Sequence, residues 1–314
     1  MRVIFMGTPA FAVDTFEQII AAGHEVVGVV TRPDAAQGRG KQIRQSPVKE
    51  AALKHGLHVL QPASAKDDAF FEALQSLAPD IIIIISYGQI IPKRILDLPR
   101  FKCINIHASL LPAYRGAAPI AWSILDGNKE TGVTVMVVDT GLDTGDMIAK
   151  ATVPIEPTDT NGTLFDKLSV VGAKLLIETL PTIEDGSAVY VKQPEDSTTE
   201  YAKMITKEMG NIDWSMEAPK IERWIRGLSP WPSAYTFHNG RTLKIWKASV
   251  SPESHKEEAG TVVQVDAQGI HVATGAGTLC IEVLQAEGKN KMEADVFLRG
   301  YSIRPGDRFV REKE

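Results

Sequence analysis

Five consecutive isoleucines, Ile81–Ile85, constrain the fold of this chain more than any other feature of its sequence. A run that is apolar on both faces belongs in a strand covered on both sides, as in parallel sheets. The run is far shorter than the roughly 18 apolar residues of a membrane helix. Four further β-rich runs share its character, and they are Val3–Met6, Val26–Val30, Cys103–Ile106 and Val133–Val138.

Stretches with helical spacing of apolar residues lie between these runs. They include Phe11–Ala22 and Ala69–Leu77, and a longer helix is expected after Asp159–Asn161, limited by Pro181. Strands that alternate with helices fold as a doubly wound, mostly parallel sheet with right-handed crossovers. The sequence therefore predicts an α/β, Rossmann-like domain over residues 1–189.

The chain changes character after residue 189. Residues 190–207 are polar and predict an ordered linker. Residues 208–314 contain one amphipathic helix, Pro219–Gly227, and then short β segments separated by turn residues, which predict a small OB-like β-barrel. The segments are Tyr235–Phe237, Leu243–Trp246, Gly260–Val265, Ile270–Ala273 and Leu279–Leu284.

Charge and cysteine content exclude several classes of protein. A net charge of −5 excludes a uniformly basic coat for nucleic acid, although not a local basic patch. The only cysteines, Cys103 and Cys280, are too few for a disulfide scaffold or a cysteine-rich zinc site. The opening segment reaches Gly7 too early for a signal peptide, and no assembly signal is visible. We therefore expect a soluble, cytoplasmic monomer without a membrane segment.

Asn105 and His107 stand two residues apart at the end of a predicted strand, so their side chains point to the same face. In open α/β sheets, ligands bind beyond the carboxyl ends of the strands. An amide and an imidazole at that edge can polarise a carbonyl group and protonate what develops from it. A buried histidine with satisfied hydrogen bonds is the alternative for this pair by itself.

An acidic loop with two glycines, Asp139–Asp146, follows the next predicted strand. Its glycines allow a tight turn that aims a carboxylate inward, and a carboxylate beside a histidine keeps the imidazole protonated. An EF-hand is excluded, because Thr144 and Lys150 stand where that loop needs glycine and glutamate. A solvated turn is the alternative for this segment alone.

Other catalytic motifs are absent from the sequence. No G-x-S-x-G elbow is present, and Gly7-Thr8-Pro9 fits neither G-x-G-x-x-G nor a Walker loop. The seven histidines form no H-E-x-x-H motif or dense ligand cluster, so no metal is expected. An amide, an imidazole and a carboxylate that meet at one sheet edge predict a carbonyl-activating site.

Two segments concentrate positive charge on this acidic chain. Arg32–Lys49 holds five basic residues and one acidic residue, which indicates contact with phosphate, with a solvated loop as the alternative. Ala218–Lys247 holds six basic residues against Glu222 alone, with aromatic residues interleaved. Most of these aromatics are expected in the barrel core, whereas the charge excess suits a groove for a nucleic-acid backbone.

The combination of motifs closely resembles the methionyl-tRNA formyltransferase family over nearly the whole chain. The H-x-S-L-L-P and L-D-T-G elements belong to the wider formyl-folate transferases, and the Gly-Arg-Gly-Lys loop with the barrel-like domain points to the tRNA-specific member. The matching segments are Gly7–Ala12, Gly38–Lys41, Ser86–Pro92, Asn105–Pro119, Gly141–Asp146, Pro230–Pro232, Ile245–Ala248 and Arg304–Phe309.

This resemblance implies an enzyme that transfers the formyl group of 10-formyltetrahydrofolate to the α-amino group of methionyl-initiator tRNA. The product is N-formylmethionyl-tRNA, which serves translation initiation. Asn105 would donate a hydrogen bond to the developing oxyanion, and protonated His107 would stabilise it and protonate the departing folate nitrogen. Asp143 would keep His107 charged and accept the amine proton.

The resemblance also assigns the binding residues. The folate pocket would be lined by Ser109, Leu110, Leu111 and Pro112 and by Tyr87, Gly88, Gln89, Ile90 and Ile91. The tRNA contacts would be Arg39, Lys41 and Arg44.

Three alternatives use parts of the same pattern. A sugar-nucleotide N-formyltransferase would share the catalytic residues but have little use for the loop around Arg39. A formyl-folate hydrolase would turn over without any acceptor. A non-catalytic RNA-binding module is disfavoured, because Asn105, His107 and Asp143 are all retained.

Overall fold

The computed structural model describes residues 1–37, 42–251 and 255–312, which form two compact units. Each unit is made from more than one stretch of the chain. The first contains residues 1–119, 131–154 and 165–202, and the second contains residues 120–130, 155–164 and the chain from 203 onward. No helix among the described residues is long and apolar enough to cross a membrane.

Aromatic packing between distant residues explains why the units interleave. The Trp122 ring meets the Trp224 ring edge-on, with 6.4 Å between centroids, and its Nε1 donates to the carbonyl of Lys203. These contacts join residues 120–130 to the second unit and leave no mark in a linear reading of the chain. The division into a domain over 1–189, a linker over 190–207 and a domain over 208–314 stays a prediction.

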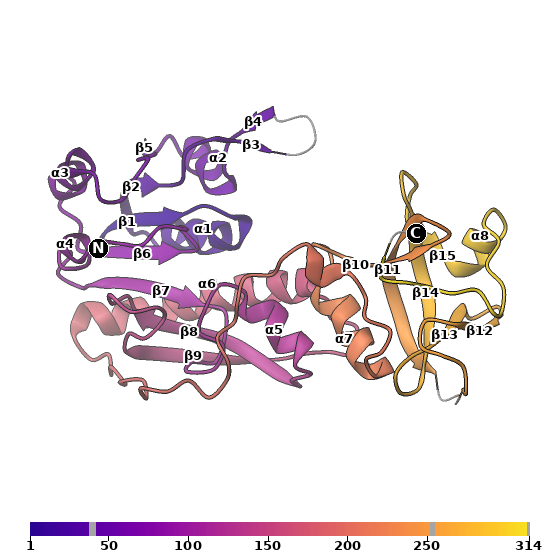
Figure 1. Ribbon diagram of the computed structural model, residues 1–314. Helices are drawn as coiled ribbons and strands as arrows, with labels where there is room; N and C mark the ends of the chain where they lie inside the picture. Colours follow the sequence, from indigo (N-terminus) through magenta and orange to yellow (C-terminus); the bar gives the residue numbers. More distant parts are fainter. Residues whose placement is uncertain (38–41, 252–254, 313–314) are drawn as a thin grey trace. The chain divides into compact units, whose positions relative to one another are not determined.

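A seven-stranded sheet forms the middle of the first unit, and its order is β5-β2-β1-β6-β7-β8-β9 (Figure 1). The strands are β1 (Arg2–Gly7), β2 (Glu25–Val30), β5 (Val59–Leu60), β6 (Ile81–Ile85), β7 (Cys103–His107), β8 (Glu130–Val137) and β9 (Met147–Pro154). All five isoleucines of β6 are buried.

The sheet order confirms the doubly wound fold. The chain passes from β1 outward to β2 and β5, returns to β6 on the other side of β1, and continues to β7, with every pair among these strands parallel. The strand β8 is antiparallel to β7, so the predicted run Val133–Val138 is not part of the parallel set. The turning point of the strand order lies between β1 and β6.

Helices follow most of the parallel strands. They are α1 (Val13–Ala21), α2 (Pro47–Lys54), α3 (Asp68–Ser76), α4 (Lys93–Leu96), α5 (Pro119–Leu125) and α6 (Asn161–Asp185), and a short 3-10 turn, η1 (Ala10–Ala12), precedes α1. Within the basic loop, β3 (Ala35–Gln37) pairs antiparallel with β4 (Gln42–Arg44).

The helix α6 continues past Pro181, contrary to the sequence prediction. Proline removes the backbone donor that would otherwise pair with the carbonyl of Ile177, one turn earlier. Continuing the helix also buries Leu180 and Ile183, which are 0% and 2% exposed. The gain from that apolar burial offsets the missing hydrogen bond.

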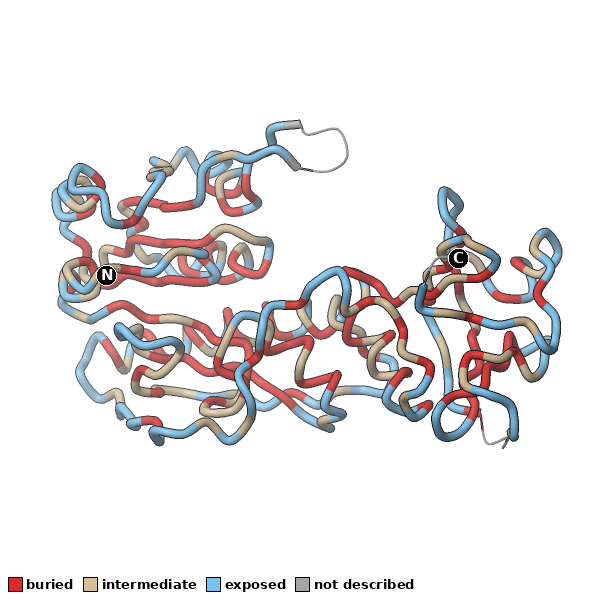
Figure 2. Tube along the Cα trace, viewed as in Figure 1, coloured by how far each residue is buried: buried red, intermediate tan, exposed pale blue. Residues whose placement is uncertain are grey.

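The second unit holds an antiparallel sheet in the order β10-β11-β14-β13-β12, with β15 paired to β14. The elements are η2 (Glu208–Gly210), α7 (Ala218–Gly227), β10 (Ala234–His238), β11 (Arg241–Ser251), β12 (Val262–Val265), β13 (Ile270–Ala273), β14 (Thr278–Ala286), β15 (Met292–Glu293) and α8 (Ala294–Leu298). All five predicted β segments are therefore strands, and Figure 2 shows buried residues along them.

The C-terminal segment joins the two edges of this sheet. Val310 exchanges both backbone hydrogen bonds with Phe237 on β10, at 3.0 Å each. Three residues earlier, the carbonyl of Asp307 accepts from the N–H of Val262 on β12 at 2.8 Å. The sheet is thereby closed into the predicted barrel-like form, because both edge strands find partners in one short segment.

We predict that Phe309→Ala destabilises the second unit by about 3–5 kcal/mol, the usual cost of truncating a buried phenylalanine. The Phe309 side chain is buried, and its ring lies 5.8 Å from that of Trp214. Urea unfolding followed by tryptophan fluorescence measures the loss. Val296→Ala, at a side chain 45% exposed, is the control. An equal loss in the free energy of unfolding for the two substitutions would contradict a role of the C-terminal segment in closing the sheet.

Candidate active site

The strand β7 places Asn105 and His107 at its carboxyl end, as predicted. The Nε2 atom of His107 lies 2.9 Å from the carbonyl oxygen of Tyr114. Because a carbonyl can only accept, Nε2 carries a proton and donates it. The other ring nitrogen, Nδ1, is then directed to the carboxylate of Asp143, with Oδ1 at 3.7 Å. The contact with Asp143 is an ion pair whenever the ring is protonated.

Asp143 lies in the loop after β8, where its φ of 56° is the left-handed conformation that aspartate tolerates better than most residues. Its Oδ2 accepts a hydrogen bond from the backbone N–H of Gly116 at 2.9 Å. One carboxylate oxygen is therefore held by the backbone while the other faces His107. The loop brings Asp143 to His107, which are two of the three side chains that the sequence predicted to meet.

Hydrogen bonds to Asp139 and a close backbone approach at Gly145 shape this acidic loop. The carboxylate of Asp139 accepts from the N–H of Gly141 at 3.0 Å and from the hydroxyl of Thr144 at 2.9 Å. A Cβ at Gly145 would stand 1.9 Å from the carbonyl oxygen of Val137, so only glycine fits there without a shift. The solvated-turn alternative does not describe a loop tied down in this way.

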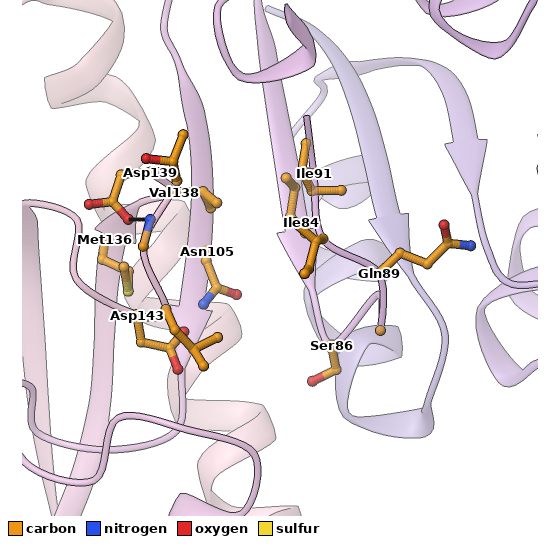
Figure 3. Close-up of a pocket in the computed structure, with 14 residues that line it drawn as sticks. Ile84, Ser86, Gln89, Ile91, Asn105, Met136, Val138, Asp139 and Asp143 are labelled. Carbon is orange, nitrogen blue, oxygen red and sulfur yellow. Dashed lines mark hydrogen bonds between the residues drawn. The ribbon is translucent and has the colours of Figure 1, made fainter. Parts of the chain in front are cut away.

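A cavity of about 470 Å³ opens beside these residues, at the carboxyl ends of β6 and β7. Figure 3 shows its two walls. Ile84, Ser86 and residues 88–91 form one wall, and Asn105, Met136 and residues 138–143 form the other. Asn105 and Asp143 thus line the cavity, whereas His107, 6% exposed, reaches it through Asp143.

The predicted folate residues from Gly88 to Ile91 all line this cavity. The side chain of Gln89 points away from it (Figure 3), because its Oε1 accepts from the N–H of Ala65 at 2.7 Å. Tyr87 is buried, its hydroxyl has no hydrogen-bond partner among the described residues, and burial raises its pKa to about 12. Tyr87 therefore supports the wall rather than lining it.

The other predicted folate segment, Ser109-Leu110-Leu111-Pro112, forms a turn behind the site and is not part of either wall. The hydroxyl of Ser109 donates to the carbonyl of Ala113 at 2.6 Å, and Leu111 is fully buried against Met136. The turn presents the Tyr114 carbonyl to His107. Direct folate contact by this segment stays a prediction.

The predicted tRNA residues fall in two groups. Arg39 and Lys41 lie outside the described residues, and Arg44 is exposed on β4. The basic residue Lys49 is neutralised, because its Nζ lies 2.7 Å from a carboxylate oxygen of Asp34. This hydrogen bond holds the pKa of Asp34 below its usual value. Among the described basic residues of this segment, Lys49 is therefore paired, whereas Arg32 and Arg44 are exposed.

Sequence reasoning missed Tyr114 and Gly116 as parts of the site. Tyr114 contributes a backbone carbonyl, which no side-chain pattern reveals. Gly116 has a φ of +127°, and a Cβ there would stand 2.7 Å from the carbonyl oxygen of Ala202. The Arg-Gly-Ala sequence was the available signal, since a glycine of this kind allows close backbone approach.

Comparison with known proteins defines the class. The Formyl transferase family matches residues 1–180, and the Formyl transferase C-terminal domain matches residues 204–302. HypX from Aquifex aeolicus in complex with tetrahydrofolic acid aligns with 100% of this chain and 52% of its own, at a TM-score of 0.64 and 18% identity. An N-formyltransferase from Helicobacter canadensis, in complex with folinic acid and dTDP-3-aminofucose, aligns with 93% of this chain and 100% of its own, at a TM-score of 0.66 and 19% identity. These two likenesses concern the fold alone.

Relatives with higher identity narrow the class. A methionyl-tRNA formyltransferase from Agathobacter rectalis is 52% identical over 310 residues, which cover 99% of this chain and 100% of the relative. One from Lachnospira eligens is 47% identical and covers 98% of each chain. The chain therefore belongs to the methionyl-tRNA formyltransferase family.

We predict that Gly145→Ala lowers kcat for formyl transfer by about 10- to 100-fold, because displacing Asp143 by 1 Å is enough for such a loss. The added methyl group would collide with the Val137 carbonyl. Gly300→Ala is the matched control, since a Cβ there meets nothing within 4 Å. Steady-state kinetics compare the two variants, and wild-type turnover in Gly145→Ala would show that the loop tolerates the shift.

Proposed function

We propose that this enzyme transfers the formyl group of 10-formyltetrahydrofolate to the α-amino group of methionyl-initiator tRNA. One observation carries the proposal: Asn105 and Asp143 line the same cavity, and Nδ1 of His107 lies 3.7 Å from Oδ1 of Asp143. An amide donor, an imidazole and a carboxylate around one cavity suit acyl transfer to an amine.

The cavity suits the folate donor in size and character. Its volume lies within the range of small-molecule sites, about 300–1,000 Å³, and its walls carry apolar side chains such as Ile84, Ile91 and Val138. Exposed Ile90 and Leu142 stand on opposite walls. A flat ring system between two apolar walls loses its contact with water on both faces.

The reaction exchanges one C–N bond for another. The neutral amine attacks the formyl carbon, and a new C–N bond forms as the carbonyl oxygen becomes an oxyanion. An α-amino group is partly neutral near pH 7, so no strong base is needed at this step. The bond between the formyl carbon and the folate nitrogen then breaks. Over the whole reaction the amine loses one proton and the folate nitrogen gains one.

Each of the three side chains has a role in this exchange. The amide of Asn105 donates to the oxyanion. The carboxylate of Asp143, held by Gly116, accepts the amine proton, directly or through water. The imidazolium of His107 stabilises the oxyanion and supplies the proton to the departing folate nitrogen. Since Nε2 is committed to the Tyr114 carbonyl, this proton leaves from Nδ1 and reaches the cavity through the Asp143 carboxylate that Nδ1 faces.

Positive side chains are proposed to hold the tRNA. Arg39, Lys41 and Arg44 are the candidates in the first unit. In the second unit several basic groups are already engaged: Arg226 forms an ion pair with Glu222, and Lys247 lies 2.7 Å from Glu282. The groups left for phosphate contact are therefore fewer than the charge count indicates. Those remaining include Lys244 and Lys291, both close to the Trp246 ring.

The full-length relatives favour tRNA over a sugar nucleotide as the acceptor, because the sugar N-formyltransferases share only the fold with this chain. No group of His, Cys, Asp and Glu side chains among the described residues is arranged to hold a metal, and the proposed reaction uses none. A cytoplasmic location and a monomeric state remain proposals from the sequence. Formyl transfer from labelled formyl-folate to Met-tRNA, compared with free methionine and amino sugars, tests the function.

We predict that Asn105→Ala and His107→Ala each lower kcat by ~100-fold or more, which corresponds to about 3 kcal/mol for one lost oxyanion contact. Single-turnover formylation of Met-tRNA measures the effect. Asn290→Ala, at an exposed position in the second unit, serves as the control. Near-normal turnover in both site variants would exclude this active site.

Affinity for tRNA should fall by roughly 0.7–0.9 log units per log unit of salt for each phosphate contacted. We expect Arg44→Ala to reduce this slope by about 1 and to leave folate affinity unchanged. Exposed Arg100, stacked on Phe101, provides the control substitution Arg100→Ala. A salt dependence that is flat in the wild type, or unaltered in Arg44→Ala, would contradict the phosphate contact.

A further inference from the structure

We propose that Gln193 is a positioning residue for formyl transfer: it is oriented by buried Arg115 and holds the backbone of the loop that presents Asp143. The inference rests on the proposed function. It concerns a residue of the segment 190–207, which the sequence indicated to be a linker.

The amide of Gln193 bridges two carbonyls of the acidic loop. Its side chain is 5% exposed, and Nε2 donates to the carbonyl of Asp143 at 2.9 Å and to that of Gly145 at 2.8 Å. These carbonyls lie on either side of Thr144, so one amide group spans the turn. The left-handed φ of Asp143 is thus supported by a contact from outside the loop.

Arg115 determines which way the Gln193 amide faces. Its Nε and Nη2 atoms donate to Oε1 of Gln193 at 3.1 Å and 2.9 Å. A guanidinium group has no acceptor, so it selects the oxygen of the amide and leaves the two N–H donors for the loop. The other Arg115 donors reach the carbonyls of Pro194 and Glu195 at 2.8 Å and 3.0 Å.

Among the described residues, the acceptors of Arg115 are all uncharged oxygens, although the arginine is only 7% exposed. Keeping an arginine buried without a carboxylate is costly, and a neutral side chain could fill a purely structural position at lower cost. We infer that the guanidinium is needed here because it orients the Gln193 side chain and also holds the backbone of residues 194–195 that follow it.

The same part of the chain also holds the Asp143 carboxylate. Gly116, the neighbour of Arg115, donates its N–H to Oδ2 of Asp143 at 2.9 Å. Asp143 is therefore held at its backbone through Gln193 and at its side chain through Gly116. The Asp143–His107 separation of 3.7 Å exceeds a hydrogen bond, so a displacement below 1 Å decides whether the pair forms one.

Gln193→Glu is the variant that separates positioning from folding. The glutamate keeps the shape of the side chain and gains an ion pair with Arg115, but it loses both donors to the loop. We expect the thermal midpoint to fall, because a carboxylate oxygen then faces the Asp143 and Gly145 carbonyls. At a temperature where the variant is still folded, kcat should fall about 10- to 100-fold, as for other residues that orient a catalytic group. Gln264→Glu, an exposed glutamine in the second unit, controls for the added charge and should keep wild-type kcat.

Two further readouts distinguish a positioning role. The ratio of kcat in Gln193→Glu to kcat in the wild type should rise as the pH falls, because a protonated glutamic acid regains one hydrogen-bond donor. In a His107→Ala background, Gln193→Glu should cost less than 3-fold, since residues that act through one group are not additive.

The outcomes are separable. Wild-type kcat in Gln193→Glu, a loss that matches the fraction unfolded, or a full loss on top of His107→Ala would each overturn the proposal. If the wild-type enzyme itself does not formylate Met-tRNA, the proposed function fails and not the role of Gln193 alone.

Discussion

The hydrogen bond from Nε2 of His107 to the backbone carbonyl of Tyr114 determines how the rest of the site is built. It commits one ring nitrogen to a fixed acceptor and leaves Nδ1 for the Asp143 carboxylate. Reversing the ring would break this hydrogen bond, and a hydrogen bond of this kind contributes about 0.5–1.5 kcal/mol. The backbone therefore determines which ring nitrogen faces Asp143, and so which nitrogen can exchange a proton with the site.

The segment that looks like a linker is part of this arrangement. The hydroxyl of Thr199 accepts from the N–H of Tyr114 at 2.7 Å, so it supports the residue on which His107 depends. Gln193 supports the loop of Asp143. The polar composition of residues 190–202 thus reflects side chains that bond inward as well as side chains in water. A polar sequence alone does not distinguish side chains that bond to the protein interior from side chains in water.

The sequence predicted those features that depend on side-chain periodicity. Ile81–Ile85 reads as a buried parallel strand and is one, and the two-residue spacing of Asn105 and His107 places both at the same sheet edge. Features that depend on backbone atoms or distant packing escaped prediction. The Tyr114 carbonyl has no sequence signature, the pairing of Trp122 with Trp224 joins residues a hundred positions apart, and the continuation of α6 through Pro181 depends on what its last turn buries.

The closure of the second sheet has a consequence for how the protein is made. Its two edge strands, β10 and β12, find their last partners in residues 307–310. During synthesis the β12 edge and the Phe237 end of the β10 edge therefore stay unpaired until nearly all of the chain described here has left the ribosome, although Ile212 donates to the Tyr235 carbonyl of β10. The parallel sheet of the first unit can assemble earlier. The nascent second unit passes through a stage with open strand edges, which are the surfaces that chaperones shield and aggregates recruit.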